Sequence, residues 1–213
     1  MRPLTDVTPK PLLEVGGKPL IVRHIEKLAA AGFAQIVVNH AHLGARIEAA
    51  LGDGARFGVD ITFSREAEAL GAAGGIANAL PQLGTGPFAA VNADVFSDYD
   101  YAQLARAIDR LAQPGPVAHL VLVDNPDHHP AGDFALHGGT VALAGARLTF
   151  SGIGAYRGEM FAGIARGTKA QLAPLLREHI AAQRVSGEHY RGRWRDIGTP
   201  ERLAALKREP DLR

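Results

Sequence analysis

The sequence predicts a doubly wound, Rossmann-like α/β fold with a mostly parallel sheet and a small β-rich extension. Two observations predict the parallel sheet: several short runs are almost entirely apolar, and they alternate with helical segments of about ten to fifteen residues. A third observation predicts the extension, because the chain becomes turn-rich and strand-like after Asp124. Strands that helices cover on both faces need apolar side chains at every position, which an alternating pattern would not provide.

Composition supports one domain spanning residues 1–213, with a first part over 1–124 and a second over 125–213. Hydrophobic residues make up 46% and the formal net charge is +1, so we expect neither nucleic acid nor a membrane as a partner. The chain has no cysteine, which excludes disulfides, thiolate metal sites and a cysteine nucleophile. No signal segment is visible, and we expect a cytoplasmic protein that is a monomer or a small homo-oligomer.

The elements of the first part follow from apolar spacing and from residues that start or stop helices. The segment Pro19–Gly32 begins with proline, repeats apolar residues at helical spacing and ends in glycine, so it predicts a helix. Asp98 is placed to cap a later helix. Strands are expected at Ala34–Asn39, Val59–Ser64, Pro87–Asp94 and Val117–Asp124, and further helices at His42–Gly54, Gly74–Leu80 (opened by its glycines) and Asp98–Gln113.

The second part is predicted to hold hairpins or a small accessory sheet, followed by helices. Its helices are expected at Lys169–Gln183 and Thr199–Glu209, with a polar, strand-like stretch at Ser186–Trp194 between them. Adjacent histidines at His128 and His129 are more typical of a surface loop than of a zinc site.

Three predicted strands end in polar residues: Asn39-His40, Ser64-Arg65-Glu66 and Asn92-Ala93-Asp94. Ligands of an open parallel sheet bind beyond the carboxyl ends of its strands, so these residues should converge on one rim. Asp94 follows a buried run and precedes Val95 and Phe96, which favours a bound hard cation, although a helix cap or a loop hydrogen bond is the alternative. Asp196 could bring a second carboxylate to that rim or merely precede a helix.

The opening loop supplies candidate cations for a phosphate. Lys10 stands between two prolines, which should hold it in a rigid, extended stretch, and the alternative is a solvated surface lysine. Lys18 follows Gly16-Gly17 and could reach a phosphate or simply flank a turn. The glycine-rich stretch Leu70–Ile76 could expose backbone N–H groups to a ligand, although any tight turn gives the same pattern.

Three motifs together resemble the sugar-1-phosphate nucleotidylyltransferases: "PLTDVTPKPLLEVGGKPLI", "NAD" at 92–94 and "WRDIGTPERL". The resemblance covers essentially the whole chain. Other stretches, among them "VVNHAHLGARIE", "AHLVLVDNPDHH" and "SGEHYRG", are similar to the N-acetylmuramate 1-phosphate uridylyltransferase branch of that family, which serves cell-wall (peptidoglycan) recycling.

The resemblance implies an enzyme with the nucleotide-diphospho-sugar transferase fold, in which UTP donates UMP to a sugar 1-phosphate. It implies a nucleotide-binding part at 1–124 and a sugar-binding part at 125–213. It also implies Mg²⁺ as cofactor. The residues that it assigns are Lys10 for phosphate, Asp94 and Asp196 for Mg²⁺, Leu4, Thr5, Gly74 and Gly75 for the nucleotide, and Asn92, Gly152 and Glu188 for the sugar. Mannose, glucose or heptose 1-phosphate as acceptor, or a non-catalytic sugar-nucleotide-binding protein, are the alternatives.

Two departures from the family pattern affect these expectations. The family has a strand and a glycine-rich loop with a catalytic arginine before the residue that matches Met1, so we expect Met1 to be an internal start. A chain that truly begins there is expected to turn over poorly. The family's uridylyl branch also has a Glu-Thr pair where this sequence has Gly71-Ala72, which should weaken or alter nucleotide contacts.

Overall fold

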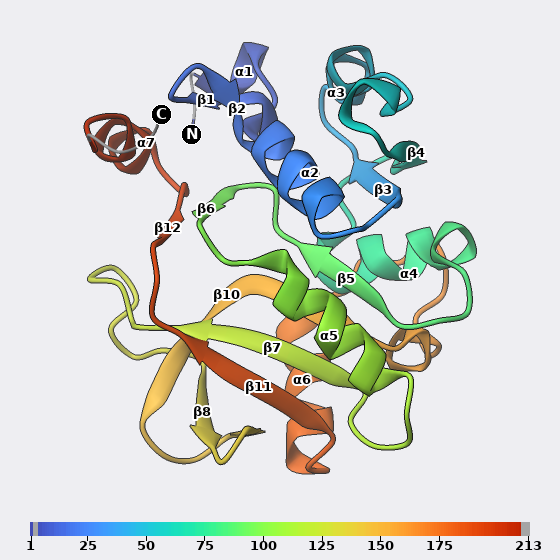
Figure 1. Cartoon of the computed structure of the whole chain (residues 1–213), viewed down its shortest axis with the longest axis vertical. Helices are drawn as coiled ribbons and strands as arrows, with labels where there is room; N and C mark the ends of the chain where they lie inside the picture. The colour runs from blue at the N-terminus through green and yellow to red at the C-terminus, as the bar shows by residue number, and fades with distance from the viewer. Residues whose placement is uncertain (2–3, 210–213) are drawn as a thin grey trace. The chain divides into compact units, whose positions relative to one another are not determined.

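The computed structural model describes Met1 and residues 4–209, and its contacts group the chain into two compact units (Figure 1). The first unit takes residues 1–69, 92–101 and 193–213, and the second takes 70–91 and 102–192. Each unit therefore combines segments that lie far apart in the sequence. The predicted division at residue 124 into nucleotide-binding and sugar-binding parts stays a prediction.

The first unit is built from three pairs of strands and the helices beside them. The pair β3–β4 is parallel, whereas β1–β2 and β6–β12 are antiparallel. Its elements are α1 (Leu4–Val7), a 3-10 turn (Lys10–Leu12), β1 (Glu14–Val15), β2 (Lys18–Pro19), α2 (Leu20–Ala30), β3 (Gln35–His40), α3 (Gly44–Leu51), a second 3-10 turn (Ala55–Phe57), β4 (Asp60–Arg65), β6 (Val95–Ser97), β12 (Trp194–Asp196) and α7 (Pro200–Lys207).

Helix α2 forms where the sequence predicts it. Pro19 precedes its first residue, where a missing N–H costs nothing, and Gly32 takes a left-handed φ of 90° just after its end. Its apolar face buries Ile21 and Ile25 in a cluster with Val38 of β3 and Ile61 of β4. Helical spacing of apolar residues thus decides both the helix and the face that it buries.

The second unit contains a six-stranded sheet in the order β5–β10–β7–β11–β9–β8. All six residues of β7 are buried, and Figure 1 shows α5 in front of this strand and α6 behind the sheet. The elements of the unit are α4 (Gly71–Leu83), β5 (Phe88–Val91), α5 (Tyr101–Leu111, whose first residue groups with the first unit), β7 (Ala118–Val123), β8 (Phe134–His137), β9 (Thr140–Ala142), β10 (Arg147–Tyr156), a 3-10 turn (Gly158–Phe161), α6 (Leu172–Ala181) and β11 (Val185–Tyr190).

Three local predictions are corrected. Strand β10 lies within the main sheet, between β5 and β7, and does not form an accessory sheet; only β8 and β9 form the expected hairpin. Helix α4 begins at Gly71, so Gly74 lies inside it and does not open it. Helix α5 begins at Tyr101 and not at Asp98, whose N–H donates to Arg193 O at 3.1 Å and prolongs the β6–β12 pairing; capping of the helix by Asp98 stays a prediction.

Pairing within the sheets is mixed, so the α/β class stands but the expected mostly parallel pairing is corrected: among the described strands only β7–β11 and β3–β4 are parallel. Strands β7 and β11 are parallel and in register from Ala118 opposite Val185 to Val123 opposite Tyr190, and β10 runs antiparallel to both β5 and β7. Across the described residues, no helix combines the length and the apolar character that crossing a bilayer requires.

Candidate active site

The side chain of Lys10 donates to the Asp94 carboxylate, although 84 positions separate the two residues. Asp94 lies in the turn before β6, and Lys10 begins the 3-10 turn that follows Pro9. The expected extended conformation at Lys10 is therefore wrong: Leu12 N donates to Pro9 O at 2.8 Å and Leu13 N to Lys10 O at 3.1 Å, which closes a turn. Both side chains keep part of their surface exposed, so the pair can exchange partners when a charged ligand arrives.

Strand β12 brings Asp196 next to the segment that carries Asp94. Asp196 stands opposite Val95 in the antiparallel pair, and Ile197 N donates to Asp94 O at 3.0 Å. Sequence spacing alone could not decide whether the two aspartates meet. The structure places them at one end of the β6–β12 pair.

Asp196 also has a positively charged side-chain partner. The Arg202 guanidinium donates to the Asp196 carboxylate. Arg202 reaches it from the first turn of α7, where Thr199 Oγ1 accepts from Arg202 N at 3.3 Å and Pro200 is the first helical residue. The stretch "GTPER" therefore starts the helix and supplies a partner to the carboxylate that precedes it.

The ends of β3 and β4 lie side by side, as expected for the rim. Asn39 Nδ2 donates to Glu66 Oε1 at 2.9 Å, and Arg65 donates to both carboxylate oxygens of Glu48 at 2.7 and 2.8 Å. The Arg65 guanidinium lowers the pKa of Glu48 to about 2. Ala93, next to Asp94, packs against the apolar cluster to which both strands contribute, and convergence of the third strand end on this rim stays a prediction.

In the second unit, Gly152 lies in an irregular stretch of β10. The register between β10 and β7 shifts between Phe150 and Gly154, and Gly152 takes a φ of 78°, which side chains rarely allow. Ser151 fills the gap in the ladder: its hydroxyl donates to Val121 O at 2.7 Å and accepts from Ile153 N at 3.1 Å. The backbone around Gly152 is therefore fixed by its neighbours.

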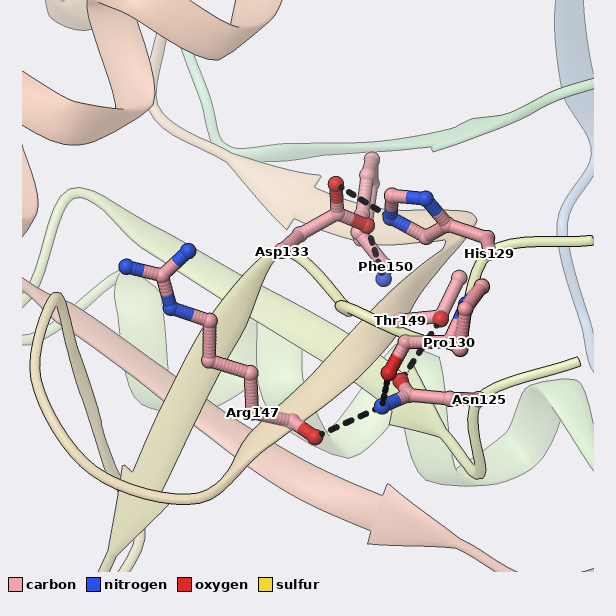
Figure 2. A network of polar contacts seen from close by, with 7 residues as sticks. All are labelled: Asn125, His129, Pro130, Asp133, Arg147, Thr149 and Phe150. Carbon is pink, nitrogen blue, oxygen red and sulfur yellow. Dashed lines mark hydrogen bonds and ion pairs between the residues drawn. The ribbon is translucent and has the colours of Figure 1, made fainter.

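The loop after β7 is attached to β10 by two polar side chains (Figure 2). Asn125 Nδ2 donates to Pro130 O at 3.1 Å and to Arg147 O at 3.0 Å, and its Oδ1 accepts from Thr149 Oγ1 at 2.8 Å. Asp133 accepts from Phe150 N at 2.8 Å and pairs with His129 at 3.1 Å. These contacts end directly before the Gly152 irregularity.

Comparison with known proteins identifies the family. The Nucleotidyl transferase family model matches residues 1–134. An N-acetylmuramate alpha-1-phosphate uridylyltransferase of Neisseria meningitidis serogroup B is 52% identical over 208 residues, which cover 95% of this chain and 90% of that protein. The chain belongs to the nucleotidyl transferase family. It is a nucleotidyltransferase, and its resemblance to the sugar-1-phosphate enzymes is confirmed.

Other members match less of this nucleotidyltransferase or share only its fold. A mannose-1-phosphate guanylyltransferase of Mycobacterium tuberculosis is 38% identical over 49% of the chain and 29% of its own length. A putative glucose-1-phosphate thymidylyltransferase from Bacillus anthracis superposes with a TM-score of 0.85 at 19% identity, over 97% of this chain and 88% of that one. A UDP-glucose pyrophosphorylase complexed with UDP-glucose superposes with a TM-score of 0.75 at 17% identity, over 97% of this chain and 92% of that one. These neighbours confirm the predicted Rossmann-like α/β class.

In this nucleotidyltransferase, Gly74 is a point of close backbone approach. Its N–H donates to Ala170 O at 3.1 Å, and a Cβ at this position would lie 2.4 Å from Thr168 O. Gly75 is buried beside it in the same helix. The glycines are thus explained by packing within the second unit, and their contact with a nucleotide stays a prediction.

Glu188 projects from β11 beside a buried histidine. Its Oε1 lies 3.6 Å from His119 Nε2, and no hydrogen-bond partner of that nitrogen is found among the described residues. His119 Nδ1 contacts Ser186 Oγ at 3.0 Å. The predicted sugar contacts of Glu188 and of the exposed Asn92 are not tested by these distances.

The opening loop of the nucleotidyltransferase carries Leu4 and Thr5 in the short helix α1. Leu4 is exposed, and Thr5 N donates to Met1 O at 3.3 Å. The guanidinium of Arg46 in α3 donates to Val7 O and so attaches the loop to a regular helix. Lys18, the other candidate cation of this loop, pairs with Glu26 at 2.5 Å.

Sequence reasoning missed His24, Tyr101 and Arg202. A polar side chain on the apolar face of a helix was the available signal for His24, which lies between the buried Val22 and Ile25. Arg202 offered a weaker signal, since an arginine in the first turn of a helix has no fixed partner in sequence. Both residues contact the segments that carry the two aspartates.

Proposed function

We propose that this chain transfers UMP from UTP to N-acetylmuramate 1-phosphate, releasing pyrophosphate and forming a UDP-sugar for peptidoglycan recycling in the cytoplasm. The observation that carries the proposal is the 52% identity, over 95% of the chain, to a protein with that named activity. The match also covers 90% of that protein. A monomer or a small homo-oligomer suffices for this chemistry.

The reaction is an in-line displacement at phosphorus. An oxygen of the sugar phosphate attacks the α-phosphorus of UTP, a new P–O bond forms, and the bond to the β-phosphate oxygen breaks. Pyrophosphate leaves with that electron pair. The protein has little covalent chemistry to perform, so it contributes by positioning the two substrates and neutralising their charge.

Lys10 provides a positive charge for the phosphates of the nucleotide. It already faces a carboxylate, so moving to a phosphate exchanges one charge-assisted contact for another. Leu4 and Thr5 of the same loop contact the nucleotide, and the N-terminal part of α4 with Gly74 and Gly75 contacts its base or ribose. On the sugar side, Asn92, Gly152 and Glu188 provide an amide, a backbone N–H and a carboxylate that sugar hydroxyls can bind.

Asp94 and Asp196 would hold Mg²⁺. Within the described residues, no group of three or more His, Cys, Asp or Glu side chains could form a cage for a metal ion. Two partly exposed carboxylates nevertheless fit this ion, which is usually bound by one or two carboxylates together with substrate phosphates and water. When bound, the ion offsets charge on the transferring phosphoryl group.

Pyrophosphate release under single-turnover conditions, with protein in excess, tests the proposal. We expect UTP with N-acetylmuramate 1-phosphate to give the fastest release in a matrix of four nucleoside triphosphates and N-acetylmuramate, N-acetylglucosamine, mannose, glucose and mannoheptose 1-phosphates. A faster reaction with another sugar phosphate would identify that compound, and not N-acetylmuramate 1-phosphate, as the acceptor. No release from any pair, with UDP-sugar still bound, would favour a non-catalytic sugar-nucleotide-binding protein.

Carboxylate-to-amide variants make the test specific to the site. Asp94→Asn and Asp196→Asn should each slow release by about 10²-fold or more, because each removes a charge that holds the metal. Asp60→Asn is the matched control, since Asp60 is exposed at the start of β4. Equal rates for all three variants would contradict the assigned roles.

A further inference from the structure

Strand β6 has one edge paired with β12 and a second edge that α2 covers. Ile197 N donates to Asp94 O at 3.0 Å and Asp98 N donates to Arg193 O at 3.1 Å, so the even-numbered residues of this segment direct their backbone groups toward β12. In an antiparallel pair these groups alternate along the strand. The carbonyls of Val95 and Ser97 therefore point away from β12.

Two side chains of α2, one helical turn apart, bind these two carbonyls. His24 Nε2 lies 2.8 Å from Val95 O, and Lys27 Nζ donates to Ser97 O at 2.8 Å. Residues at i and i+3 of a helix lie on one face, which matches the spacing of alternate carbonyls along a strand. The helix thus takes the place of a neighbouring strand at this edge.

The geometry fixes which nitrogen of His24 carries the proton. A carbonyl oxygen only accepts, so Nε2 donates to Val95 O, and Nδ1 then accepts from the hydroxyl of Tyr101 at 2.7 Å. Burial lowers the pKa of His24 to about 4, so the ring is neutral near pH 7. Tyr101 thereby orients the imidazole toward Val95.

We propose that His24 is a positioning residue for the Asp94 carboxylate, because its Nε2–H holds the carbonyl of Val95, the residue that follows Asp94. The inference rests on the proposed function, in which Asp94 holds Mg²⁺. Val95 also stands opposite Asp196, so one imidazole holds the backbone beside both carboxylates. The Asp94 carbonyl is held by Ile197 N and the next carbonyl by His24, so both peptide groups that flank Val95 are fixed.

The His24 contact differs from ordinary core packing because it fixes a backbone carbonyl, that of Val95. An apolar residue at position 24 could fill the same volume, but it would leave the buried Val95 carbonyl and the Tyr101 hydroxyl without partners. The peptide that follows Val95 would then be free to rotate toward solvent, next to the segment that carries Asp94. Partners that orient metal-binding side chains typically change metal affinity by 10–100-fold when they are removed.

Two amide variants distinguish the effect of losing the hydrogen bond to Val95 O from the effect of losing the buried imidazole. His24→Gln places its amide nitrogen where Nε2 was and can still donate to Val95 O, whereas His24→Asn reaches only the level of Nδ1. Mn²⁺ binding in the presence of UTP, followed by electron paramagnetic resonance of free Mn²⁺, needs no turnover. We expect H24N to weaken Mn²⁺ binding about tenfold or more and H24Q to stay near the parent value. Equal effects of the two variants, or none, overturn the inference.

Hydrogen exchange of the metal-free protein provides a second readout. Exchange at residues 95–98 should be faster in H24N than in H24Q, although both variants lower the melting temperature. If exchange there is equal in the two variants, His24 is only a core residue and the inference fails. Should H24N not fold, Tyr101→Phe replaces it, because loss of the hydroxyl removes the contact at Nδ1 that orients the imidazole toward Val95; unchanged exchange in Y101F also overturns the inference.

These results are separate from the proposed function. The parent protein alone decides that function, through pyrophosphate release. The difference between H24N and H24Q decides the role of His24, even if the substrate differs from N-acetylmuramate 1-phosphate.

Discussion

Lys10 and Asp94 form an ion pair that joins the opening loop to the turn before β6. The pair links a candidate phosphate-binding cation directly to a candidate metal-binding carboxylate. Because each of the two partly neutralises the other, neither is an isolated charge at the protein surface. A triphosphate with its metal ion presents both opposite charges at once, so it can replace the two halves of this pair together.

Replacing Lys10 by Met should slow single-turnover pyrophosphate release by about 10²–10³-fold. The variant removes the cation that faces the nucleotide phosphates and leaves Asp94 without its partner. Lys10→Arg should recover part of the rate, since it keeps the charge with a different geometry. Lys207→Met, at the exposed end of α7, is the control. Equal rates for K10M and K207M would remove Lys10 from the site.

Asn125 should contribute more to the stability of the loop after β7 than any one of the residues that it contacts. Asn125→Ala leaves two carbonyls and the Thr149 hydroxyl without their bonds, so we expect a loss of about 2 kcal/mol in the free energy of unfolding. Thr149→Val removes one of the three bonds and should cost about 1 kcal/mol. Urea denaturation measures both losses, with the exposed Asp127→Ala in the same loop as reference. Similar values for all three variants would show that the network contributes little.

The elements most accurately predicted from sequence are those whose pattern is local. Helix α2 and strand β7 follow from helical spacing and from an uninterrupted apolar run, and both formed within a few residues of the expected bounds. Strand β10 was misplaced because its stretch "LTFSGIGAY" contains two glycines and lies among turn residues. Its central position depends on pairing with β5 and β7, which no local pattern encodes.

The candidate site shows the same division between local and non-local information. Residue types and motif order were enough to select Lys10, Asp94 and Asp196 through the family resemblance. Their cationic partners and the support beneath them were not predictable, because Arg202 and His24 act through contacts that only folding creates. The helix expected to start at Asp98 starts later for a similar reason: strand pairing with β12 extends to Asp98, and α5 begins at Tyr101.

Glu48 should make the stability of the fold depend on acid pH. The Arg65 guanidinium, with His40, lowers its pKa from 4.5 to about 2, so the stabilisation is complete above the unfolded value near 4.5. It is lost as pH falls from there toward 2. Urea denaturation of the parent and Glu48→Gln should show a stability difference that is constant near neutrality and shrinks through this window. Asp60→Asn, at an exposed position of β4, is the control variant, and a difference for E48Q that persists at low pH would contradict the assignment.

His24 should make the stability of the fold depend on pH in a second, higher range. The cause differs from that at Glu48, because folding keeps His24 neutral whereas it keeps Glu48 charged. Burial lowers its pKa from 6.5 to about 4, so below pH 6.5 the unfolded chain binds a proton that the folded chain does not bind. The folded state therefore loses stability as pH falls from about 6.5 to 4, by at most about 1.4 kcal/mol per pH unit from this group. His24→Gln removes the titration, so H24Q should lose less stability than the parent over this range, whatever its stability at pH 7. His42→Gln, at an exposed position, is the control variant. Parallel curves for the parent and H24Q between pH 7 and 4.5, measured by urea denaturation, would show that the ring is not held neutral by burial, and the Nε2–H donation to Val95 would lose its basis.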